Sequence, residues 1–185
     1  SWMENLSLEG RAGYFDQYGI IRDVMQNHLL QMLALVAMEP PVSLDSHDVR
    51  DEKVKVLRCV PPLTLNDLVI GQYTAGALGG RQHFGYREEG GVAEGSRTPT
   101  FAAAALHIRN RRWDGVPILI RAGKGMQESM TEIRIGFHPI PGNIFRASMG
   151  ALSPNELVIR VQPDAGISIR LMNKVPGLGI KLAQS

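Results

Sequence analysis

A long helix is predicted by Gly19-Ile-Ile-Arg-Asp-Val-Met-Gln-Asn-His-Leu29 and by the apolar residues that continue it to Met38. Leucine, methionine, valine and alanine fill nearly every position of its second half, a pattern typical of a helix that is buried on most sides. A polar cluster interrupts the first half, and its members are Arg22, Asp23, Gln26, Asn27 and His28. A polar group on a buried helix needs a hydrogen-bonding partner, so this cluster marks either a structural network or a chemical site.

His28 is open to two interpretations on the helical pattern alone. The commoner fate of a lone histidine on an apolar helix is a core position with its hydrogen bonds satisfied. The alternative is a general base, because imidazole titrates near neutral pH and can take a proton during a reaction. The pattern by itself does not choose between the two.

The rest of the chain predicts a second helix followed by a sheet. Capping residues in Ser43-Leu-Asp-Ser-His47 precede apolar positions at helical spacing from Asp48 to Val60, and Pro61-Pro62 ends that helix. Several β-rich runs follow without intervening helices, which favours an antiparallel sheet. These candidate strands are Asp67–Tyr73, Phe101–Ile108, Pro117–Arg121, Glu132–Phe137, Glu156–Val161 and Ile167–Met172. We therefore predict an α+β fold in which a long buried helix and a second helix pack on a largely antiparallel β-sheet.

The segment from Ala75 to Pro99 contains seven glycines and is predicted to be a mobile loop. The two glycine-rich stretches, Gly76-Ala-Leu-Gly-Gly80 and Gly177-Leu-Gly179, do not lie between a strand and a helix as a dinucleotide fingerprint must. Neither stretch therefore predicts a nucleotide site.

Composition excludes several other classes of protein. The 185 residues are 44% hydrophobic and 21% charged, which is ordinary for a globular domain. A formal net charge of +2 is too small to indicate nucleic-acid binding, and Arg109-Asn-Arg-Arg-Trp113 is interpreted as a turn before a strand. Cys59 is the one cysteine, so no disulfide can form within the chain, and no apolar run is long enough to predict a membrane helix. The remaining histidines are scattered, so no metal site is predicted.

Five ordered motifs resemble one enzyme family. The segment Glu9-Gly-Arg-Ala-Gly-Tyr-Phe-Asp-Gln-Tyr-Gly-Ile-Ile-Arg-Asp-Val-Met-Gln-Asn-His28 is similar to the one that carries the catalytic histidine of glucose-6-phosphate 1-dehydrogenases. Four later motifs recur in the order of that family, namely Asp48-Val-Arg-Asp-Glu-Lys-Val-Lys-Val-Leu-Arg58, Arg112-Trp-Asp-Gly-Val-Pro117, Arg121-Ala-Gly-Lys124 and Asn155-Glu-Leu-Val-Ile-Arg-Val-Gln-Pro163. Several long motifs in order are far more specific than one short pattern, so the resemblance favours the general base for His28.

The resemblance implies an oxidoreductase that oxidises D-glucose 6-phosphate with NADP to 6-phospho-D-glucono-1,5-lactone, the first step of the oxidative pentose phosphate pathway. Residues 1–185 would then be part of the C-terminal substrate and dimerisation domain. The dinucleotide-binding domain, with an aspartate that supports the catalytic histidine, would lie outside this chain. We therefore expect the chain alone to be inactive.

The resemblance also implies roles for individual residues. His28 would accept the proton of the sugar 1-hydroxyl while C1 gives a hydride to NADP. The residues that match substrate contacts of the family are Asp23, Glu4, Lys124 and Gln162. Carboxylates suit a polyol because they accept hydrogen bonds from its hydroxyl groups. For Asp23 and Glu4 a simple solvated position is the alternative.

A basic set on the predicted strands matches a second, structural NADP site, and its members are Arg121, Arg134 and Arg160. Arginine forks suit phosphates, although a run of cations with Lys124 and Arg170 can also be only a solvated face. The chain departs from the family here, because Ser129 and Met130 replace a basic pair, Met3 replaces a lysine and Ser168 replaces an aromatic residue. We expect the structural NADP to bind weakly or not at all.

The resemblance implies glucose 6-phosphate as the substrate and a homodimer or homotetramer as the assembly, with no nucleic-acid or membrane partner. The phrases Ala37-Met-Glu-Pro-Pro41 and Asn173-Lys-Val-Pro-Gly-Leu-Gly179 are plastid-like, which favours the chloroplast stroma over the cytoplasm. Two alternatives stay open from the sequence. One is a non-catalytic paralogue that acts as a regulatory or assembly subunit, possibly in a hetero-oligomer. The other is a stand-alone sugar-phosphate-binding domain.

Overall fold

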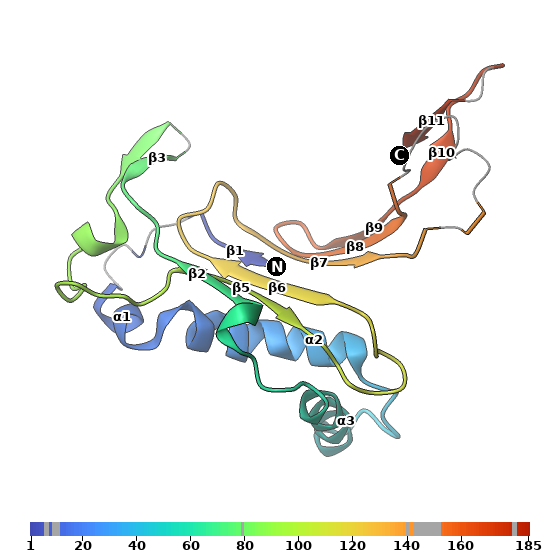
Figure 1. The fold of residues 1–185 in the computed structure, drawn as a ribbon, viewed down its shortest axis with the longest axis horizontal. Helices are drawn as coiled ribbons and strands as arrows, with labels where there is room; N and C mark the ends of the chain where they lie inside the picture. Colours follow the sequence, from blue (N-terminus) through green and yellow to red (C-terminus); the bar gives the residue numbers. More distant parts are fainter. Residues whose placement is uncertain (6–7, 9–11, 79, 140, 143–152, 179–180) are drawn as a thin grey trace. The chain divides into compact units, whose positions relative to one another are not determined.

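The computed structural model describes residues 1–185 except 6–7, 9–11, 79, 140, 143–152 and 179–180 (Figure 1). Contacts divide the chain into two compact units, Ser1–Ser129 and Met130–Ser185. We call the first the helical unit and the second the strand unit, and each is described by itself.

The predicted long helix is present and begins earlier than expected. Its three consecutive parts are α1 (Ala12–Ile20), the π-helix η1 (Ile21–Leu29) and α2 (Leu30–Ala37). Gly19 breaks the helical path with φ 68° and ψ 167°, a conformation that glycine tolerates and other residues rarely adopt. The kink lies directly before the π-helix that carries Asp23 and His28.

The strands of the helical unit pair antiparallel apart from the short strand β1. Strands β2 and β5 pair antiparallel, β5 and β6 pair antiparallel, and β1 joins β6 in parallel. Their bounds are β1 (Trp2–Met3), β2 (Leu68–Gly71), β5 (Phe101–Leu106) and β6 (Ile118–Gly123). Alternate residues of β5 and β6 pack beneath the helix, as the two-residue period of a strand requires. The core formed there includes Ile20, Val24, Leu29, Ala102, Ala104, Leu106, Ile120 and Ala122.

The expectation of a helix buried nearly all round is correct for one face only. The sheet covers the side of Val24, Met25 and Leu29, while the polar residues Arg22, Gln26, Asn27 and His28 are exposed. Leu35 is also 51% exposed despite its apolar side chain. The physical reason is that a single sheet layer buries one stripe of a helix.

The segment from Ala75 to Pro99, predicted to be a loop, contains short regular elements that were not predicted. Two short strands, β3 (Gly76–Leu78) and β4 (Arg81–His83), form an antiparallel hairpin, and the 3-10 turn η3 (Tyr86–Glu88) follows. The Tyr86 ring is fully buried and meets Phe15 edge-on with 6.1 Å between ring centroids. A buried aromatic residue therefore anchors this segment to α1.

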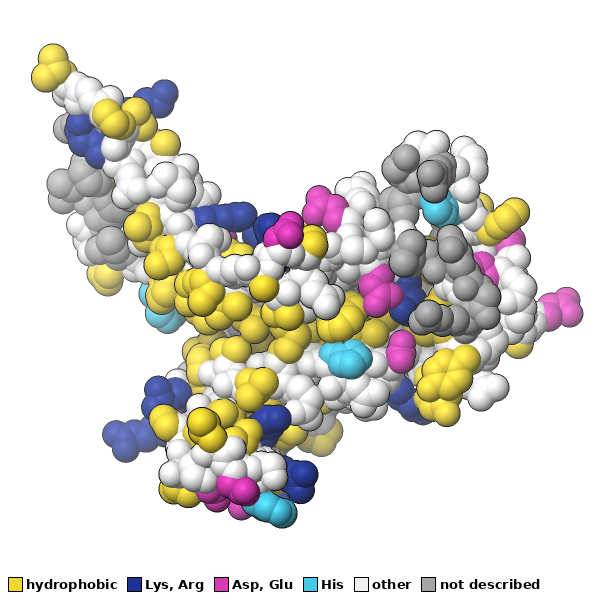
Figure 2. All heavy atoms as spheres, turned by 180° about the vertical axis from the view of Figure 1, so that it is seen from behind, with side chains coloured by type: hydrophobic (Ala, Val, Ile, Leu, Met, Phe, Trp, Pro, Cys, Tyr) yellow, Lys and Arg dark blue, Asp and Glu magenta, His cyan; other side chains and the backbone are white. Residues whose placement is uncertain are grey.

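The second predicted helix is confirmed as α3 (Ser46–Arg58). Asp45 caps it by accepting a hydrogen bond of 2.8 Å from the His47 amide. Val56 is buried against a small cluster with Ala37 and Ile108. Charged side chains gather at the bottom of the view in Figure 2, where Figure 1 places α3. The charges of α3 thus form a solvated face rather than a site.

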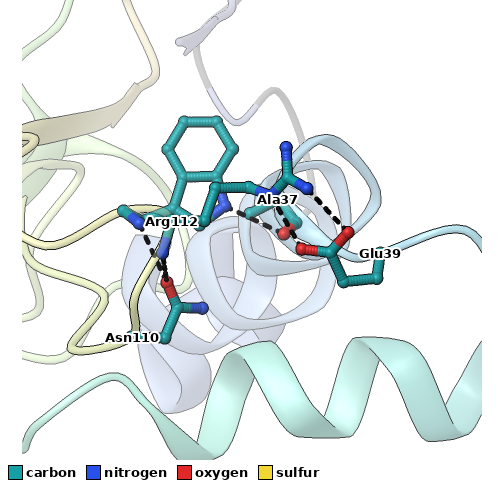
Figure 3. A network of polar contacts seen from close by, with 5 residues as sticks. Ala37, Glu39, Asn110 and Arg112 are labelled. Carbon is teal, nitrogen blue, oxygen red and sulfur yellow. Dashed lines mark hydrogen bonds and ion pairs between the residues drawn. The ribbon is translucent and has the colours of Figure 1, made fainter.

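The turn predicted at Arg109–Trp113 is present and packs against the end of α2 (Figure 3). The Arg112 guanidinium donates two hydrogen bonds, of 2.7 and 2.8 Å, to the Glu39 carboxylate, and Trp113 Nε1 donates to the Ala37 carbonyl at 3.0 Å. Asn110 Oδ1 accepts from the amides of Arg112 and Trp113. The indole therefore satisfies a carbonyl at a helix C-terminus, which has no partner within the helix.

The strand unit consists, in its described part, of a three-stranded antiparallel sheet and a small hairpin. The sheet contains β7 (Met130–Gly136), β8 (Glu156–Gln162) and β9 (Gly166–Arg170), and the hairpin pairs β10 (Met172–Lys174) with β11 (Leu182–Gln184). The predicted strands of both units are confirmed within a few residues. The strands β1, β3, β4, β10 and β11 were not predicted, because two or three residues carry too little periodicity.

Candidate active site

The ends of β1 and β6 bring Glu4 and Lys124 together. The Glu4 amide donates to the Gly123 carbonyl at 2.9 Å, and the Glu4 carbonyl accepts from the Met126 amide at 2.9 Å. Both residues are thus fixed at the same edge of the sheet. The Lys124 ammonium lies 2.5 Å from Glu4 Oε2, with side chains that are 12% and 33% exposed respectively.

Trp2 connects this ion pair to His28. The Trp2 Nε1 donates to Glu4 Oε1 at 3.0 Å, so the same carboxylate holds the indole and the ammonium through its two oxygens. The Trp2 ring stacks on the His28 imidazole with 4.8 Å between centroids and 14° between planes. Four residues from β1, η1 and the end of β6 therefore form one continuous cluster.

The π-helix changes the relation between Asp23 and His28. In an α-helix residues five apart differ by about 140° around the axis, which would place them on different faces. A π-helix closes bonds between residues five apart, and the Leu30 amide does donate to the Met25 carbonyl at the end of η1. Residues 23 and 28 consequently lie nearly one above the other, with Asp23 half-buried and His28 exposed.

The cluster provides three kinds of chemistry at one sheet edge. His28 can take or give a proton, Glu4 and Asp23 can accept hydrogen bonds from hydroxyl groups, and Lys124 can hold an anion. The Lys124 ammonium also lies 5.5 Å from the centroid of the Phe15 ring, a distance at which a cation is attracted to the face of an aromatic ring. Such a set suits a polyol that carries negative charge.

In the strand unit, Arg134 is already engaged by an acidic partner. Its guanidinium donates to both oxygens of Glu132, at 2.6 and 3.3 Å, and the Glu132 side chain is 1% exposed. The hydrogen bond with Glu132 raises the Arg134 pKa above its ordinary value, against the smaller opposing effect of burial. Arg160 lies opposite Glu132 in the register of β7 and β8. Both Arg160 and Gln162 are exposed.

The substituted positions of the basic set have identifiable neighbours. Ser168, which stands where the family resemblance implies an aromatic residue, lies opposite Val158, and Val158 lies opposite Arg134. Ser168 is therefore two strands away from Arg134. Ser129 belongs to the helical unit, where its hydroxyl accepts from the Asn5 amide at 2.9 Å and donates to Asn5 Oδ1 at 2.6 Å. Arg121 is exposed on β6.

Sequence reasoning predicted Glu4, Asp23, His28 and Lys124 as site residues, and it did not predict Trp2, which the structure places among three of them. The sequence signal for Trp2 was weak, because a two-residue strand shows no period. The one available clue was its spacing: in an extended chain Trp2 and Glu4, two positions apart, lie on the same face, opposite to Met3. Within the described ranges there is no group of three or more histidine, cysteine or acidic side chains able to hold a metal ion. Among the same residues, no helix has the length and apolar character needed to cross a bilayer.

The whole chain, residues 1–185, matches the family model described as glucose-6-phosphate dehydrogenase, C-terminal domain. The chain belongs to the glucose-6-phosphate dehydrogenase family. The resemblance seen in the sequence motifs is thereby confirmed, and the α+β architecture is that of the family's C-terminal domain.

Members of the glucose-6-phosphate dehydrogenase family from distant organisms align over this chain. It is 57% identical over 185 residues to glucose-6-phosphate 1-dehydrogenase 1, chloroplastic, of Arabidopsis thaliana, covering 98% of this chain and 32% of the relative. It is 50% identical to the Dictyostelium discoideum enzyme, with 100% and 36% covered. A solved glucose-6-phosphate dehydrogenase in complex with its substrate glucose 6-phosphate superimposes with a TM-score of 0.88 at 47% identity, over 100% of this chain and 37% of that one. The chain thus spans about a third of the length of these relatives.

Proposed function

We propose that this chain contributes the substrate side of an enzyme that oxidises D-glucose 6-phosphate to 6-phospho-D-glucono-1,5-lactone with NADP. The observation that carries the proposal is the cluster of His28, Trp2, Glu4 and Lys124 at one sheet edge, in a chain of the glucose-6-phosphate dehydrogenase family. When bound, NADP supplies the hydride acceptor. No observation favours the non-catalytic paralogue or the stand-alone binding domain.

Each residue of the cluster has a task in this proposal. His28 takes the proton of the sugar 1-hydroxyl through the imidazole that Trp2 holds by stacking. Asp23 and Glu4 accept hydrogen bonds from the sugar hydroxyl groups, and Lys124 provides positive charge for the anionic substrate. Gln162, from the strand unit, is proposed as a further substrate contact. Glu4 binds the Lys124 ammonium directly in this structure. We therefore expect the sugar phosphate to replace part of this Glu4–Lys124 contact when it binds.

The test is a hybrid subunit in which this chain replaces the matching third of the Arabidopsis relative. His28→Asn in the hybrid subunit is expected to lower kcat by roughly two to four decades, the usual contribution of a positioned general base. Steady-state NADPH formation measures kcat and KM separately. An inactive parent hybrid would contradict the proposed function. A His28→Asn variant with a raised KM and an unchanged kcat would contradict the proposed role of His28 as a base. The 185-residue chain alone is expected to show no turnover.

A structural NADP is proposed to bind weakly or not at all. Arg134 is paired with the buried Glu132, so a phosphate has to compete with a carboxylate for the same guanidinium. Ser168 offers no ring on which a nucleotide base could stack. Calorimetry of the hybrid subunit should therefore find one tight nucleotide per subunit, and two tight sites would show that this interpretation is wrong.

We also propose a homodimer formed through the apolar face of the strand unit. Leu157, Ile159, Ile167 and Ile169 alternate onto one face of β8 and β9, and Ile167 and Ile169 are 72% and 58% exposed. Exposed contiguous apolar surface of this kind marks an association site. Ile167→Asp should shift sedimentation equilibrium toward the monomer, whereas Asp164→Asn should not.

The plastid stroma is the proposed location, because several relatives of this chain are named chloroplastic, including those of Arabidopsis thaliana and Spinacia oleracea at 57% and 56% identity. Immunodetection in purified chloroplasts and in the cytosolic fraction of the source cells tests it. Signal confined to the cytosol would contradict the proposal.

A further inference from the structure

Three consecutive residues, Thr98-Pro99-Thr100, lie between the helix that carries His28 and the strand end that carries Lys124, and we call them the bridge segment. On the helix side, the Thr98 hydroxyl donates to the Asp16 carbonyl at 2.7 Å. The Pro99 carbonyl accepts from the Ile20 amide at 3.1 Å, one residue after the kink at Gly19. The bridge segment thus holds the helix where its path breaks, directly before η1.

The kink and the bridge segment fit each other closely. A Cβ atom placed on Gly19 would lie 3.0 Å from Thr98 Cγ2 and 3.5 Å from Pro99 Cδ. The φ of 68° at the same glycine is also unfavourable for any other residue. The absence of a side chain at Gly19 therefore allows the helix to approach the bridge segment.

On the sheet side, the bridge segment holds Lys124. The Thr100 carbonyl accepts from the Lys124 amide at 3.0 Å, and the Thr100 amide donates to the Gly71 carbonyl at 2.9 Å. The Thr100 hydroxyl accepts from the Tyr73 amide at 2.9 Å, and the residue is fully buried. Thr100 is thereby fixed to the ends of two strands at once.

Adjacent carbonyls carry the two decisive bonds. Successive carbonyls of an extended chain point to opposite sides, so Pro99 can reach the helix while Thr100 reaches the strand. One planar peptide unit separates them, and its length and angles are nearly invariant. The distance between Ile20 and Lys124 is consequently set by a rigid element rather than by flexible side chains.

We propose that the bridge segment positions the His28-bearing helix against Lys124, and that Thr98 and Thr100 are positioning residues for the reaction. The inference rests on the proposed function, because it holds that the bridge segment sets the distance between the proposed base, His28, and the proposed anion-binding group, Lys124. Misplacing a catalytic group by about 1 Å can cost up to about a hundredfold in rate. A small shift of the helix kink is therefore enough to affect turnover.

The experiment compares Thr98→Val with Thr98→Ser in the hybrid subunit. Valine keeps the branched shape beside Gly19 but removes the hydroxyl bond, and we expect kcat to fall about tenfold with KM within about twofold. Serine keeps the hydroxyl and should retain kcat within about twofold. Thr64→Val is the matched control, because the Thr64 hydroxyl also makes one bond, of 2.8 Å to Asp67 Oδ2, without joining the two elements. It should leave kcat unchanged.

Two further measurements separate positioning from general destabilisation. In a His28→Asn background, Thr98→Val should produce no additional loss of kcat, since there is no base left to misplace. Amide hydrogen exchange on the 185-residue chain should be faster at Ile20 and Lys124 in Thr98→Val but not in Thr64→Val. An undiminished Thr98→Val effect in the His28→Asn background, or unchanged exchange at both amides, would overturn the inference.

The failure of the proposed function would look different. A His28→Asn variant with wild-type turnover would remove the base from the mechanism, while the exchange at Ile20 and Lys124 would still report whether the bridge segment holds the two elements. Conversely, an inactive His28→Asn variant together with a fully active Thr98→Val variant would overturn only the positioning role of the bridge segment.

Discussion

The helical unit and the strand unit place isoleucine in opposite surroundings. Ile120 on β6 is 8% exposed because the long helix lies over its strand, whereas Ile167 on β9 is 72% exposed. The large buried cluster also lies entirely in the helical unit, where most of its members come from the helix and from β5 and β6 and the others are Leu8 and Tyr86. Two strands of similar composition thus differ because one has a helical layer above it and the other, among the described residues, does not.

This difference assigns the two units different tasks. The helical unit has its own core, so it can hold Glu4, His28 and Lys124 in fixed positions without help. The strand unit has an apolar face that folding leaves exposed, and such a face is stabilised by association. The proposed catalytic cluster therefore belongs to the first unit, and the proposed dimer contact belongs to the second.

The strongest test of the comparison truncates one isoleucine in each unit. Ile120→Ala is expected to lower the free energy of unfolding by about 2–5 kcal/mol, because it removes buried methylene groups and leaves a cavity. Ile167→Ala should change it by no more than about 0.5 kcal/mol in the monomer, because that side chain already contacts water. Urea unfolding of the 185-residue chain at low concentration measures both.

The same pair also reports on assembly. If the strand unit forms the dimer, Ile167→Ala should become costly at high protein concentration, while the cost of Ile120→Ala should not depend on concentration. Equal costs for the two variants in the monomer would mean that the strand unit has a core of its own, and the comparison would be wrong.

The sequence predicted the long elements because their periods are long enough to detect. The helix ending near Met38 and strands such as β5 and β8 show clear patterns of 3.6 and 2 residues. The π-helix η1 could not be predicted, since its composition is that of any amphipathic helix and the extra residue per turn leaves no mark on the pattern. The relation between Asp23 and His28 was therefore beyond sequence reasoning.

The glycine-rich segment from Ala75 to Pro99 misled for a different reason. Glycine and polar residues predict a loop when contacts are ignored. In the structure Asp16, on α1, accepts hydrogen bonds from Ser96 and Tyr86, and from the Ala93 amide. Tyr86 lies 70 positions and Ser96 lies 80 positions from Asp16 in the sequence. No local sequence pattern encodes contacts between residues so far apart in the chain.

The hydrogen bonds accepted by the Asp16 carboxylate predict that the stability of the helical unit is sensitive to acid. Burial alone would raise the Asp16 pKa, but the hydrogen bonds that its carboxylate accepts from Ser96, Tyr86 and the Ala93 amide lower it below its ordinary value of 3.8. A lowered pKa in the folded state stabilises the fold above the unfolded value, and this stabilisation is lost as pH falls through the folded pKa. Asp16→Asn should therefore cost about 1–3 kcal/mol at pH 7, since an amide nitrogen then faces donors.

Chemical denaturation at pH 7 and at successively lower pH measures this effect. The difference between Asp16→Asn and the parent should shrink as pH falls below 3.8 and then vanish. Asp164→Asn is the control in the strand unit, because Asp164 is exposed with φ 52°, which asparagine tolerates. A pH-independent cost for Asp16→Asn would mean that its charge does not hold the segment.

The smallest expected effect lies at Ser129, the last residue of the helical unit. Ser129→Ala and Ser129→Lys both remove the two hydrogen bonds to Asn5, and each should cost less than about 1 kcal/mol because the site is exposed. Only the lysine adds a charge at a position where the family resemblance implies a cation. The melting temperature with and without NADP, measured on the hybrid subunit, isolates that charge: the NADP-dependent rise should be larger in Ser129→Lys than in Ser129→Ala. Identical rises would show that the missing cation does not limit nucleotide binding, and that the Glu132 carboxylate on Arg134 is the dominant obstacle.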